Sequence, residues 1–200
     1  MIYIVGLGPG HKDYIVPRAI EILNKADLVI GFKRAIESLD FIDNRKIIVE
    51  SLKETLKIIN ENKDKNIGLV ASGDPTFYGI SNYIKNNYEG KVVITPGISS
   101  FQYLACAVGK SWNEALVSSV HGRKADFIKE VLNKKLSFWL TDKENNPKRL
   151  CELLLENSIK CNVFIGENLS YENEIIANGS PEELINREYS DLSVVVVEVI

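Results

Sequence analysis

The sequence predicts an α/β protein that is built from two α/β domains. Short apolar runs alternate with amphipathic helical patterns, as they do where helices separate the strands of a parallel sheet. The final run, LSVVVVEVI at residues 192–200, is apolar nearly throughout and is typical of a central buried strand. Five earlier runs indicate a parallel sheet in the first half, at residues 2–6, 28–31, 47–50, 67–71 and 92–95.

Helical patterns lie between these runs. The first helix is expected at residues 16–26, where Pro17 fits the first turn because an amide hydrogen would lack a partner there. A helix that begins after an Asn–Pro step is expected at residues 146–158 and carries several leucines on one side. Two further helices are expected at residues 52–63 and 77–88.

The length of 200 residues permits one large domain or two small ones. The best candidate linker is GKSWNEA, residues 109–115. We therefore expect an N-terminal α/β domain at residues 1–110 and a C-terminal α/β domain at residues 111–200. The second domain is expected to use ALVSSV, KLSFWLT, NVFIGE and the final apolar run as strands.

The composition excludes several classes of protein. The apolar fraction of 45% is ordinary for a globular protein, and the net charge of −3 gives no general attraction to nucleic acid. The two histidines are far apart in sequence, so we expect no metal bound by the protein. The three cysteines form no C-x-x-C pair and indicate free, mostly buried thiols in a reducing cytoplasm. No signal peptide or membrane span is predicted.

The opening stretch IYIVGLGPGHKDY, residues 2–14, contains a strand followed by three alternating glycines. A strand, a glycine turn and a helix also form the first unit of a dinucleotide-binding fold. The third glycine of that fingerprint would stand where this chain has His11, and no acid ends the next strand at Gly31 and Phe32. The spacing therefore argues against a dinucleotide, and a nicotinamide-dependent oxidoreductase remains the alternative from another class.

Two further strand ends in the first half carry polar residues. In GLVASGDPTFYG, Asp74 can accept hydrogen bonds from a ligand's ribose or amino group, although Asp–Pro is also a common turn and helix cap. In VVITPGISS, the hydroxyls and amides of Ser99 and Ser100 suit a carboxylate or polar group, or plain helix capping. Ligands of open α/β sheets collect at such carboxyl ends.

The turn SSVHGRKAD, residues 118–126, places a histidine, a glycine and an arginine together after a strand. Arg123 offers a planar fork of donors for a carboxylate, and His121 can exchange a proton near neutral pH. The alternative for Arg123 is an exposed loop residue. The alternative for His121 is a side chain satisfied by the backbone.

Taken in order, VGLGPG, AIEILNKADLVIG, SGDPTFYG and TPGISS resemble the tetrapyrrole methylase family, and the match spans essentially the whole chain. The resemblance implies a tetrapyrrole methylase fold: two α/β domains around a ligand cleft, with a mostly parallel sheet in the first and a mixed sheet in the second. It implies methyl transfer from S-adenosylmethionine. PGISSFQYLACAVGKSW followed by SSVHGR is most similar to members that methylate C5 of a corrin precursor, converting cobalt-precorrin-7 to cobalt-precorrin-8 in cobalamin biosynthesis.

The resemblance also implies which residues contact the methyl donor. They come from the strand ends of both halves, and the positions after residue 140 rest on shorter motifs. The implied donor contacts are Gly8, Pro9, Gly10, Gly73, Asp74, Phe77, Tyr78, Ser99, Ser100, Leu140, Gly166, Glu167, Ala177 and Gly179.

The implied substrate is a corrin macrocycle that carries several carboxylates. Arg123 is the first candidate to hold one, with Lys124, Arg18 and Lys33 as further candidates. His121 is a candidate acceptor for a proton that leaves C5, and no residue declares itself as the base. The resemblance implies a homodimer. Because some relatives fuse a domain that methylates C15 and decarboxylates a side chain, a separate protein with that activity is an expected partner.

Several alternatives remain open at this point. Within the class, the chain is similar to tetrapyrrole methylases that act at another ring carbon, and to diphthine synthase, which shares the fold but modifies a protein histidine. The HGR turn and the short length favour the corrin enzyme. A protein that holds the macrocycle without chemistry is a third class, and turnover of labelled donor separates it from an enzyme.

Overall fold

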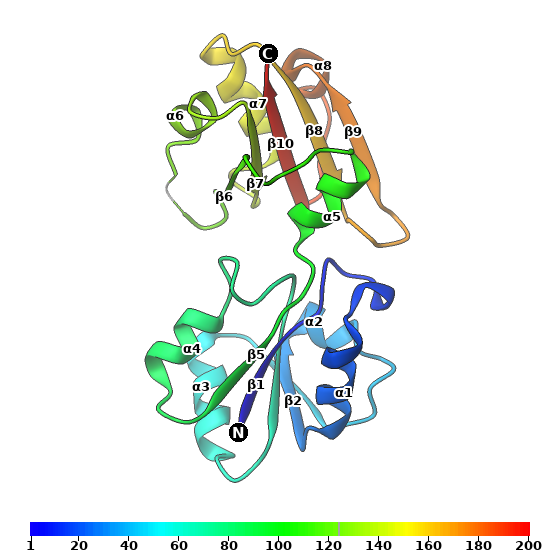
Figure 1. The fold of residues 1–200 in the computed structure, drawn as a ribbon, viewed down its shortest axis with the longest axis vertical. Helices are drawn as coiled ribbons and strands as arrows, with labels where there is room; N and C mark the ends of the chain where they lie inside the picture. The colour runs from blue at the N-terminus through cyan, green and yellow to red at the C-terminus, as the bar shows by residue number, and fades with distance from the viewer. Residues whose placement is uncertain (124) are drawn as a thin grey trace. The chain divides into compact units, whose positions relative to one another are not determined.

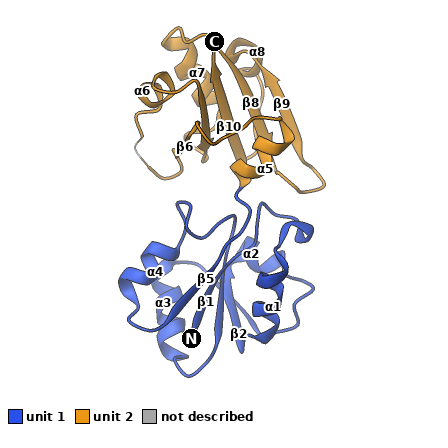
Figure 2. Ribbon diagram, in the orientation of Figure 1, with its two compact units in different colours: residues 1–99 blue, residues 100–200 orange. Residues whose placement is uncertain are grey.

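The computed structural model describes residues 1–123 and 125–200, which form two compact units, Met1–Ser99 and Ser100–Ile200 (Figure 2). The division precedes helix α5 (Ser100–Ala107), whereas the sequence placed a boundary at residue 110. Helix α5 belongs to unit 2 because its Phe101 ring packs against Phe138 of that unit, 6.1 Å between centroids.

Unit 1 contains a parallel five-stranded sheet in the order β3-β2-β4-β1-β5 (Figure 1). This arrangement confirms the parallel sheet predicted for the first half of the chain. The elements of unit 1 are β1 (Ile2–Gly6), the 3-10 helix η1 (Lys12–Tyr14), α1 (Pro17–Lys25), β2 (Leu28–Phe32), α2 (Lys33–Glu37), β3 (Lys46–Val49), α3 (Leu52–Glu61), β4 (Ile67–Ala71), α4 (Ser81–Asn87) and β5 (Val92–Thr95).

The two faces of this sheet are covered by different helices. Successive strand residues point to opposite faces, so Ile2 and Ile4 pack in one buried cluster while Val5 packs in another. Helices α1 and α2 cover the face of Val5, and α3 and α4 cover the face of Ile4 (Figure 1). The strands are apolar on both sides because both faces are buried.

The helix expected at residues 77–88 begins later, at Ser81. Tyr78 has a positive φ of 51°, which is incompatible with a continuous helix, and the Ser81 hydroxyl donates to the Pro75 carbonyl at 2.6 Å. The strand end at residues 72–80 is therefore a turn rather than the first part of the helix.

Unit 2 contains a mixed five-stranded sheet in the order β6-β7-β10-β8-β9. Strand β10 is central and antiparallel to β7 and β8, while β6 and β7 are parallel, which confirms both the mixed sheet and the buried final strand. Besides α5, the elements of unit 2 are β6 (Leu116–Ser119), α6 (Phe127–Leu132), β7 (Leu136–Leu140), α7 (Pro147–Glu156), β8 (Cys161–Glu167), β9 (Ile175–Gly179), α8 (Pro181–Leu184) and β10 (Ser193–Val199).

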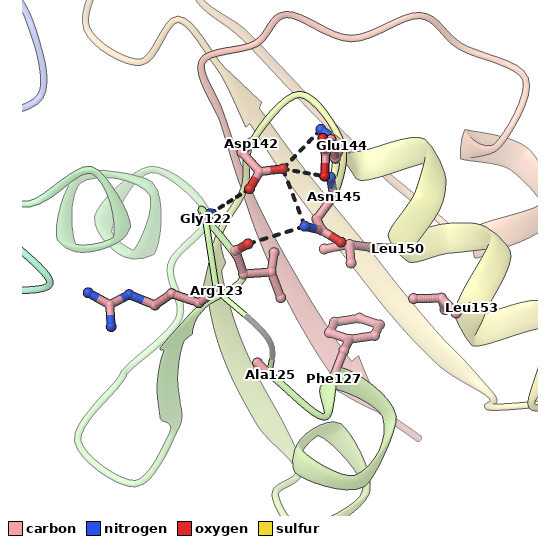
Figure 3. A pocket seen from close by; sticks show the side chains of 10 residues that line it. Gly122, Arg123, Ala125, Phe127, Asp142, Glu144, Asn145, Leu150 and Leu153 are labelled. Carbon is pink, nitrogen blue, oxygen red and sulfur yellow. Dashed lines mark hydrogen bonds between the residues drawn. The ribbon is translucent and has the colours of Figure 1, made fainter.

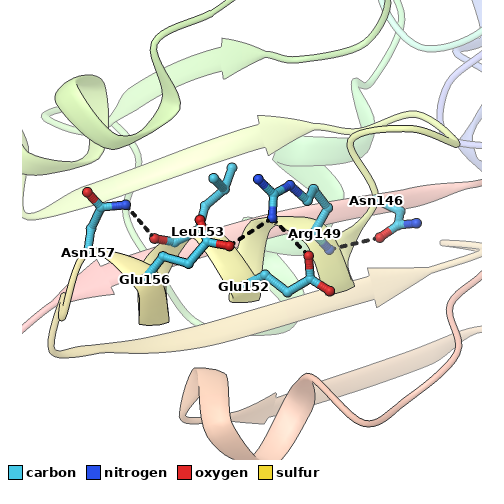
Figure 4. Close-up of polar contacts among 6 residues, drawn as sticks. All are labelled: Asn146, Arg149, Glu152, Leu153, Glu156 and Asn157. Atoms are coloured by element: carbon cyan, nitrogen blue, oxygen red, sulfur yellow. Dashed lines mark hydrogen bonds and ion pairs between the residues drawn. The ribbon is translucent and has the colours of Figure 1, made fainter.

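Helix α7 shows how local sequence sets an element of this unit. It begins at Pro147 because the Asn146 side chain caps it, accepting from the Arg149 amide at 2.9 Å. Arg149 then bridges Glu152 and Glu156 along the outer face (Figure 4). Leu150, Cys151 and Leu154 form the opposite, buried face and pack against the sheet with α6 and α8.

Two of the three cysteines are buried, as the sequence analysis expected. Burial raises the pKa of Cys151 to about 12 and that of Cys161 to about 11, whereas Cys106 is exposed. Among residues 1–123 and 125–200, no helix combines the length and apolar character that crossing a membrane requires.

Candidate functional site

Three glycine turns meet at the carboxyl edge of the unit 1 sheet. They follow β1, β4 and β5, which are neighbours in the sheet. A Cβ atom at Gly6 would lie 2.5 Å from Gly97 N and 2.7 Å from Gly73 O, so only hydrogen fits between these backbones. The Gly73 amide also donates to Gly8 O at 2.8 Å. The structure therefore brings Gly8 and Gly73, two predicted donor contacts, into direct contact.

Asp74 ties two of these turns together. Its Oδ1 accepts from the Thr76 amide at 2.7 Å and from the Thr76 hydroxyl, and its Oδ2 accepts from the Gly97 amide at 3.2 Å. The turn-forming role considered for this carboxylate is thus present. Each carboxylate oxygen can accept two hydrogen bonds, so acceptor capacity remains for a ligand. The ligand role of Asp74 stays a prediction.

The other predicted residues of unit 1 lie around the same edge. Pro9 and Gly10 continue the turn after β1. The ring of Tyr78 is exposed and packs edge-to-face on Phe77, with 4.8 Å between centroids. Ser99 is buried, and a Cβ at Gly73 would lie 3.7 Å from its Cα, so Ser99 belongs to this cluster, whereas Ser100 begins helix α5 in unit 2.

In unit 2, the predicted residues Leu140 and Gly166 share one row of the sheet. Both are register partners of Val194 on the central strand, and Ile176 follows in the same row. Ala177 lies one step along β9. Gly179 lies two steps further and pairs with Val163, so the structure does not bring it to this row.

The Glu167 side chain has protein partners of its own. It is buried at the end of β8, accepts from the Ser190 amide at 2.8 Å and lies 3.4 Å from the Arg187 guanidinium. A buried carboxylate needs such partners to offset the loss of water. The Glu167 side chain therefore holds the segment before β10. If Glu167 contacts the methyl donor as predicted, we expect the contact to come from its backbone.

The His121 side chain lies in the turn after β6 and is oriented by a residue at the end of the neighbouring strand β7. Its Nδ1 lies 2.9 Å from the carbonyl oxygen of Thr141, the residue that follows β7. A carbonyl oxygen only accepts, so the proton of the neutral ring lies on Nδ1 and Nε2 keeps its lone pair. The backbone contact considered as an alternative for this residue is present, and it leaves Nε2 as the nitrogen able to take a proton.

Asp142, which the sequence analysis missed, fixes the same turn. Its Oδ2 accepts from the Gly122 amide at 2.6 Å, and its Oδ1 accepts from the amides of Glu144 at 2.9 Å and Asn145 at 2.7 Å. Partial burial raises the pKa of Asp142, but these hydrogen bonds outweigh it and hold the pKa below its ordinary value. The signal that could have identified Asp142 from the sequence is its place directly after the predicted strand KLSFWLT.

A cavity of about 580 Å³ lies beside this turn (Figure 3). Its polar wall is made by Asp142 and Asn145, and its apolar wall by Phe127, Leu150 and Leu153. Arg123 is exposed and also lines the cavity, but its side chain extends away from Asp142 in Figure 3. Lys124, a further candidate from sequence, lies outside the described residues.

The cationic candidates of unit 1 are held in surface ion pairs. Arg18 Nη1 lies 2.6 Å from Glu21 Oε2, and Lys33 Nζ lies 3.8 Å from Glu37 Oε1. The Lys25 and Arg18 hydrogen bonds lower the pKa of Glu21 to about 2. Arg34, which sequence reasoning did not single out, instead donates to the Ser72 hydroxyl at 3.2 Å.

Comparison with known proteins adds a second line of observation. Residues 1–185 match the family model described as Tetrapyrrole (Corrin/Porphyrin) Methylases. The chain is 36% identical over 214 residues to the Probable cobalt-precorrin-7 C(5)-methyltransferase of Methanocaldococcus jannaschii, covering 99% of this chain and 98% of that protein. It is 32% identical over 201 residues to the Cobalt-precorrin-7 C(5)-methyltransferase of Salmonella typhimurium, covering 99% of each.

A solved structure is also similar to this chain over its whole length. The cobalamin biosynthesis precorrin-6Y methylase from Archaeoglobus fulgidus matches with a TM-score of 0.79 and 27% identity, covering 100% of this chain and 97% of that one. Together with the parallel first sheet and the mixed second sheet, this match confirms the tetrapyrrole methylase fold predicted from the sequence.

The triple-turn contact makes a first prediction. Gly97→Ala should lower the free energy of unfolding by about 1–3 kcal/mol, because the methyl group is forced against Gly73 O and Gly6. Urea unfolding measures this loss, and amide exchange of Gly73 should accelerate as its bond to Gly8 O loosens. Gly109→Ala is the control: its Cβ meets nothing within 4 Å, so only the cost of its φ of +64° remains. A Gly73 amide as protected in Gly97→Ala as in the wild type would contradict the prediction.

The Asp142 network makes a second prediction. Asp142→Asn should lower the free energy of unfolding by about 1–3 kcal/mol at pH 7, because an amide offers one acceptor oxygen where the network uses two. The folded pKa of Asp142 lies below 3.8, so its contribution is full above that value and is lost as the pH falls through the folded pKa.

The difference between Asp142→Asn and the wild type should therefore shrink as the pH falls below about 4. Denaturant unfolding of both proteins from pH 7 to pH 3 measures it. A difference that stays constant over this range would show that the carboxylate charge does not stabilise the turn.

Proposed function

The chain belongs to the tetrapyrrole (corrin/porphyrin) methylase family, and we propose that it transfers the methyl group of S-adenosylmethionine to C5 of cobalt-precorrin-7, giving cobalt-precorrin-8 in cobalamin biosynthesis. The observation that carries this proposal is identity of 36% and 32% to two relatives of that name over 99% of the chain. A shared length of this extent includes both units and all the strand-end turns, rather than one motif.

We propose that the methyl donor contacts the glycine turns of unit 1, at Gly8, Pro9, Gly10, Gly73 and Asp74. Glycines let a ligand approach the backbone closely, and the spare acceptor capacity of Asp74 suits the ribose hydroxyls or the amino group of the donor. Phe77, Tyr78, Ser99 and Ser100 are the remaining contacts proposed from this part of the chain.

In unit 2, the proposed donor contacts are Leu140, Gly166 and Ala177, with Glu167 acting through its backbone. Leu140 and Gly166 share a register row and Ala177 is one step away, which supports their acting together. Gly179 is retained from the family resemblance alone.

The main contribution of the protein to the transfer is to align the ring carbon, the methyl carbon and the sulfur. A bond forms between C5 and the methyl carbon as the carbon–sulfur bond breaks, the sulfonium becomes a neutral thioether, and C5 loses its proton. The sulfonium is already a good leaving group, so no protein-bound metal is needed. Holding the reacting atoms in line can supply about 7–11 kcal/mol in favourable cases.

We propose that His121 Nε2 accepts the proton and that Arg123 binds a ring carboxylate. The contact of His121 Nδ1 with Thr141 O supports the first role, because it leaves Nε2 as the basic nitrogen at this strand end. Arg123 lies two residues after His121 in the same turn and is exposed to solvent. An exposed guanidinium beside the proposed base supports the second role, because it can bind a carboxylate in a bidentate manner.

The cellular setting is proposed from the resemblance. We propose a cytoplasmic homodimer whose product passes to a separate protein that methylates C15 and decarboxylates a side chain.

A methylation assay tests the proposed function. The protein is incubated with cobalt-precorrin-7 and donor carrying a ¹³C-labelled methyl group, and NMR locates the new methyl. Label at C5 is expected. Label at another ring carbon would indicate a different member of the family, and binding of the macrocycle without transfer would indicate a carrier.

Asp74→Ala should weaken binding of S-adenosylhomocysteine by about 10- to 100-fold, the effect of losing a hydrogen bond to a charged group. Calorimetry measures this affinity. Thr76→Val is the matched control, because it removes the hydroxyl bond within the turn and keeps the carboxylate. Normal affinity in Asp74→Ala, with only a loss of stability, would leave Asp74 as a turn residue. NAD should not bind either protein.

A further inference from the structure

One cationic side chain of unit 1 is held where the glycine turns emerge. Arg34 lies in α2, which begins directly after β2, and β2 pairs in parallel with β4. Its Nη2 donates to the hydroxyl of Ser72 at 3.2 Å, and Ser72 stands between the end of β4 and Gly73. The Arg34 guanidinium is therefore fixed at the carboxyl edge of the sheet, next to the proposed donor turns.

Among the residues that the structure describes, no carboxylate neutralises the charge of Arg34. Glu37 is within helical reach of both Lys33 and Arg34, and the structure pairs it with Lys33 at 3.8 Å. Arg18 is likewise paired, with Glu21 at 2.6 Å. Within residues 1–123 and 125–200, no carboxylate lies within ion-pair distance of Arg34, and its contact is with a neutral hydroxyl.

The Ser72 contact leaves most of the guanidinium available. An arginine has five N–H donors, and one bond to a hydroxyl leaves the fork able to bind a carboxylate in a bidentate manner. The same bond restricts a long exposed side chain before any ligand arrives, which lowers the entropy cost of binding.

We infer that Arg34 binds a carboxylate of a polycarboxylate macrocycle and that Ser72 is its positioning residue. This inference rests on the proposed function, which supplies a polyanionic substrate. The chain has a net charge of −3, so binding a substrate of the same sign requires local cations. Among the described residues, Arg34 has no acidic partner that a substrate carboxylate would have to displace.

Steady-state kinetics of four variants test the inference. Arg34→Ala should raise KM for cobalt-precorrin-7 by about 10- to 100-fold, as expected when a bond between charged groups is lost. Arg34→Lys keeps the charge but loses the fork, so its KM should lie between those of the wild type and Arg34→Ala. Ser72→Ala should raise KM by a few-fold, because the guanidinium is present but no longer held.

Arg45→Ala is the matched control. Arg45 is exposed in the same unit and carries the same charge, but it directly precedes β3 and so lies at the opposite, amino edge of the sheet. Its KM should stay within about twofold of the wild type, since rim charges remote from a ligand contribute little. All variants should bind S-adenosylhomocysteine with wild-type affinity and unfold at the wild-type temperature.

A binding measurement separates this inference from the proposed function. Fluorescence titration with uroporphyrin, a polycarboxylate tetrapyrrole, needs no methyl transfer. Weaker binding by Arg34→Ala than by Arg45→Ala supports the inference even if cobalt-precorrin-7 is not methylated. Equal uroporphyrin affinity in these two variants, or unchanged KM in Arg34→Ala, would overturn it.

Discussion

The contact between the three glycine turns of unit 1 is the constraint on which the candidate site depends. Gly6, Gly73 and Gly97 approach so closely that no side chain fits between them. The carboxyl edge of the sheet is therefore lined by backbone amides and carbonyls, with Asp74 as the carboxylate that joins two of the turns. Parallel strands direct all three turns to one edge, so the parallel order β4-β1-β5 and the glycine contact support each other.

In unit 2, side chains rather than glycine contacts join the turns at the carboxyl ends of two neighbouring strands. Among the described residues, the turns after β6 and β7 are joined by Asp142, which accepts from the Gly122 amide, and by the contact between Thr141 O and His121. This arrangement leaves bulky, chemically active side chains at the edge, where unit 1 presents backbone. The unit 2 turns are joined through a carboxylate, whereas the unit 1 turns need the absence of Cβ atoms in addition to the Asp74 carboxylate. The two edges therefore respond differently to substitution, because a Cβ atom at Gly6 or Gly97 clashes and one at Gly122 meets nothing within 4 Å.

The sequence predicted most of the fold and part of the candidate site, and the differences have physical causes. Apolar runs located the strands because both faces of the first sheet and the centre of the second are buried. The helix start at residue 77 was wrong because Tyr78 adopts a positive φ that periodicity does not reveal. Asp142 was missed because one of its partners, Gly122, is 20 positions away and is brought to it by the pairing of β6 with β7.

Lys33 and Arg18 were named from the sequence as candidate cations for the substrate and Arg34 was not, but their surroundings in the structure differ. The partners of Lys33 and Arg18 are Glu37 and Glu21, at the helical spacings i,i+4 and i,i+3, so their pairing is a local property. The contact of Arg34 with Ser72 spans 38 positions and exists because β2 and β4 are neighbours. A cation that is satisfied locally contributes helix stability and retains little field for a ligand. A cation placed by tertiary structure beside a neutral partner keeps its field, and ligand recognition is the use that such a placement favours.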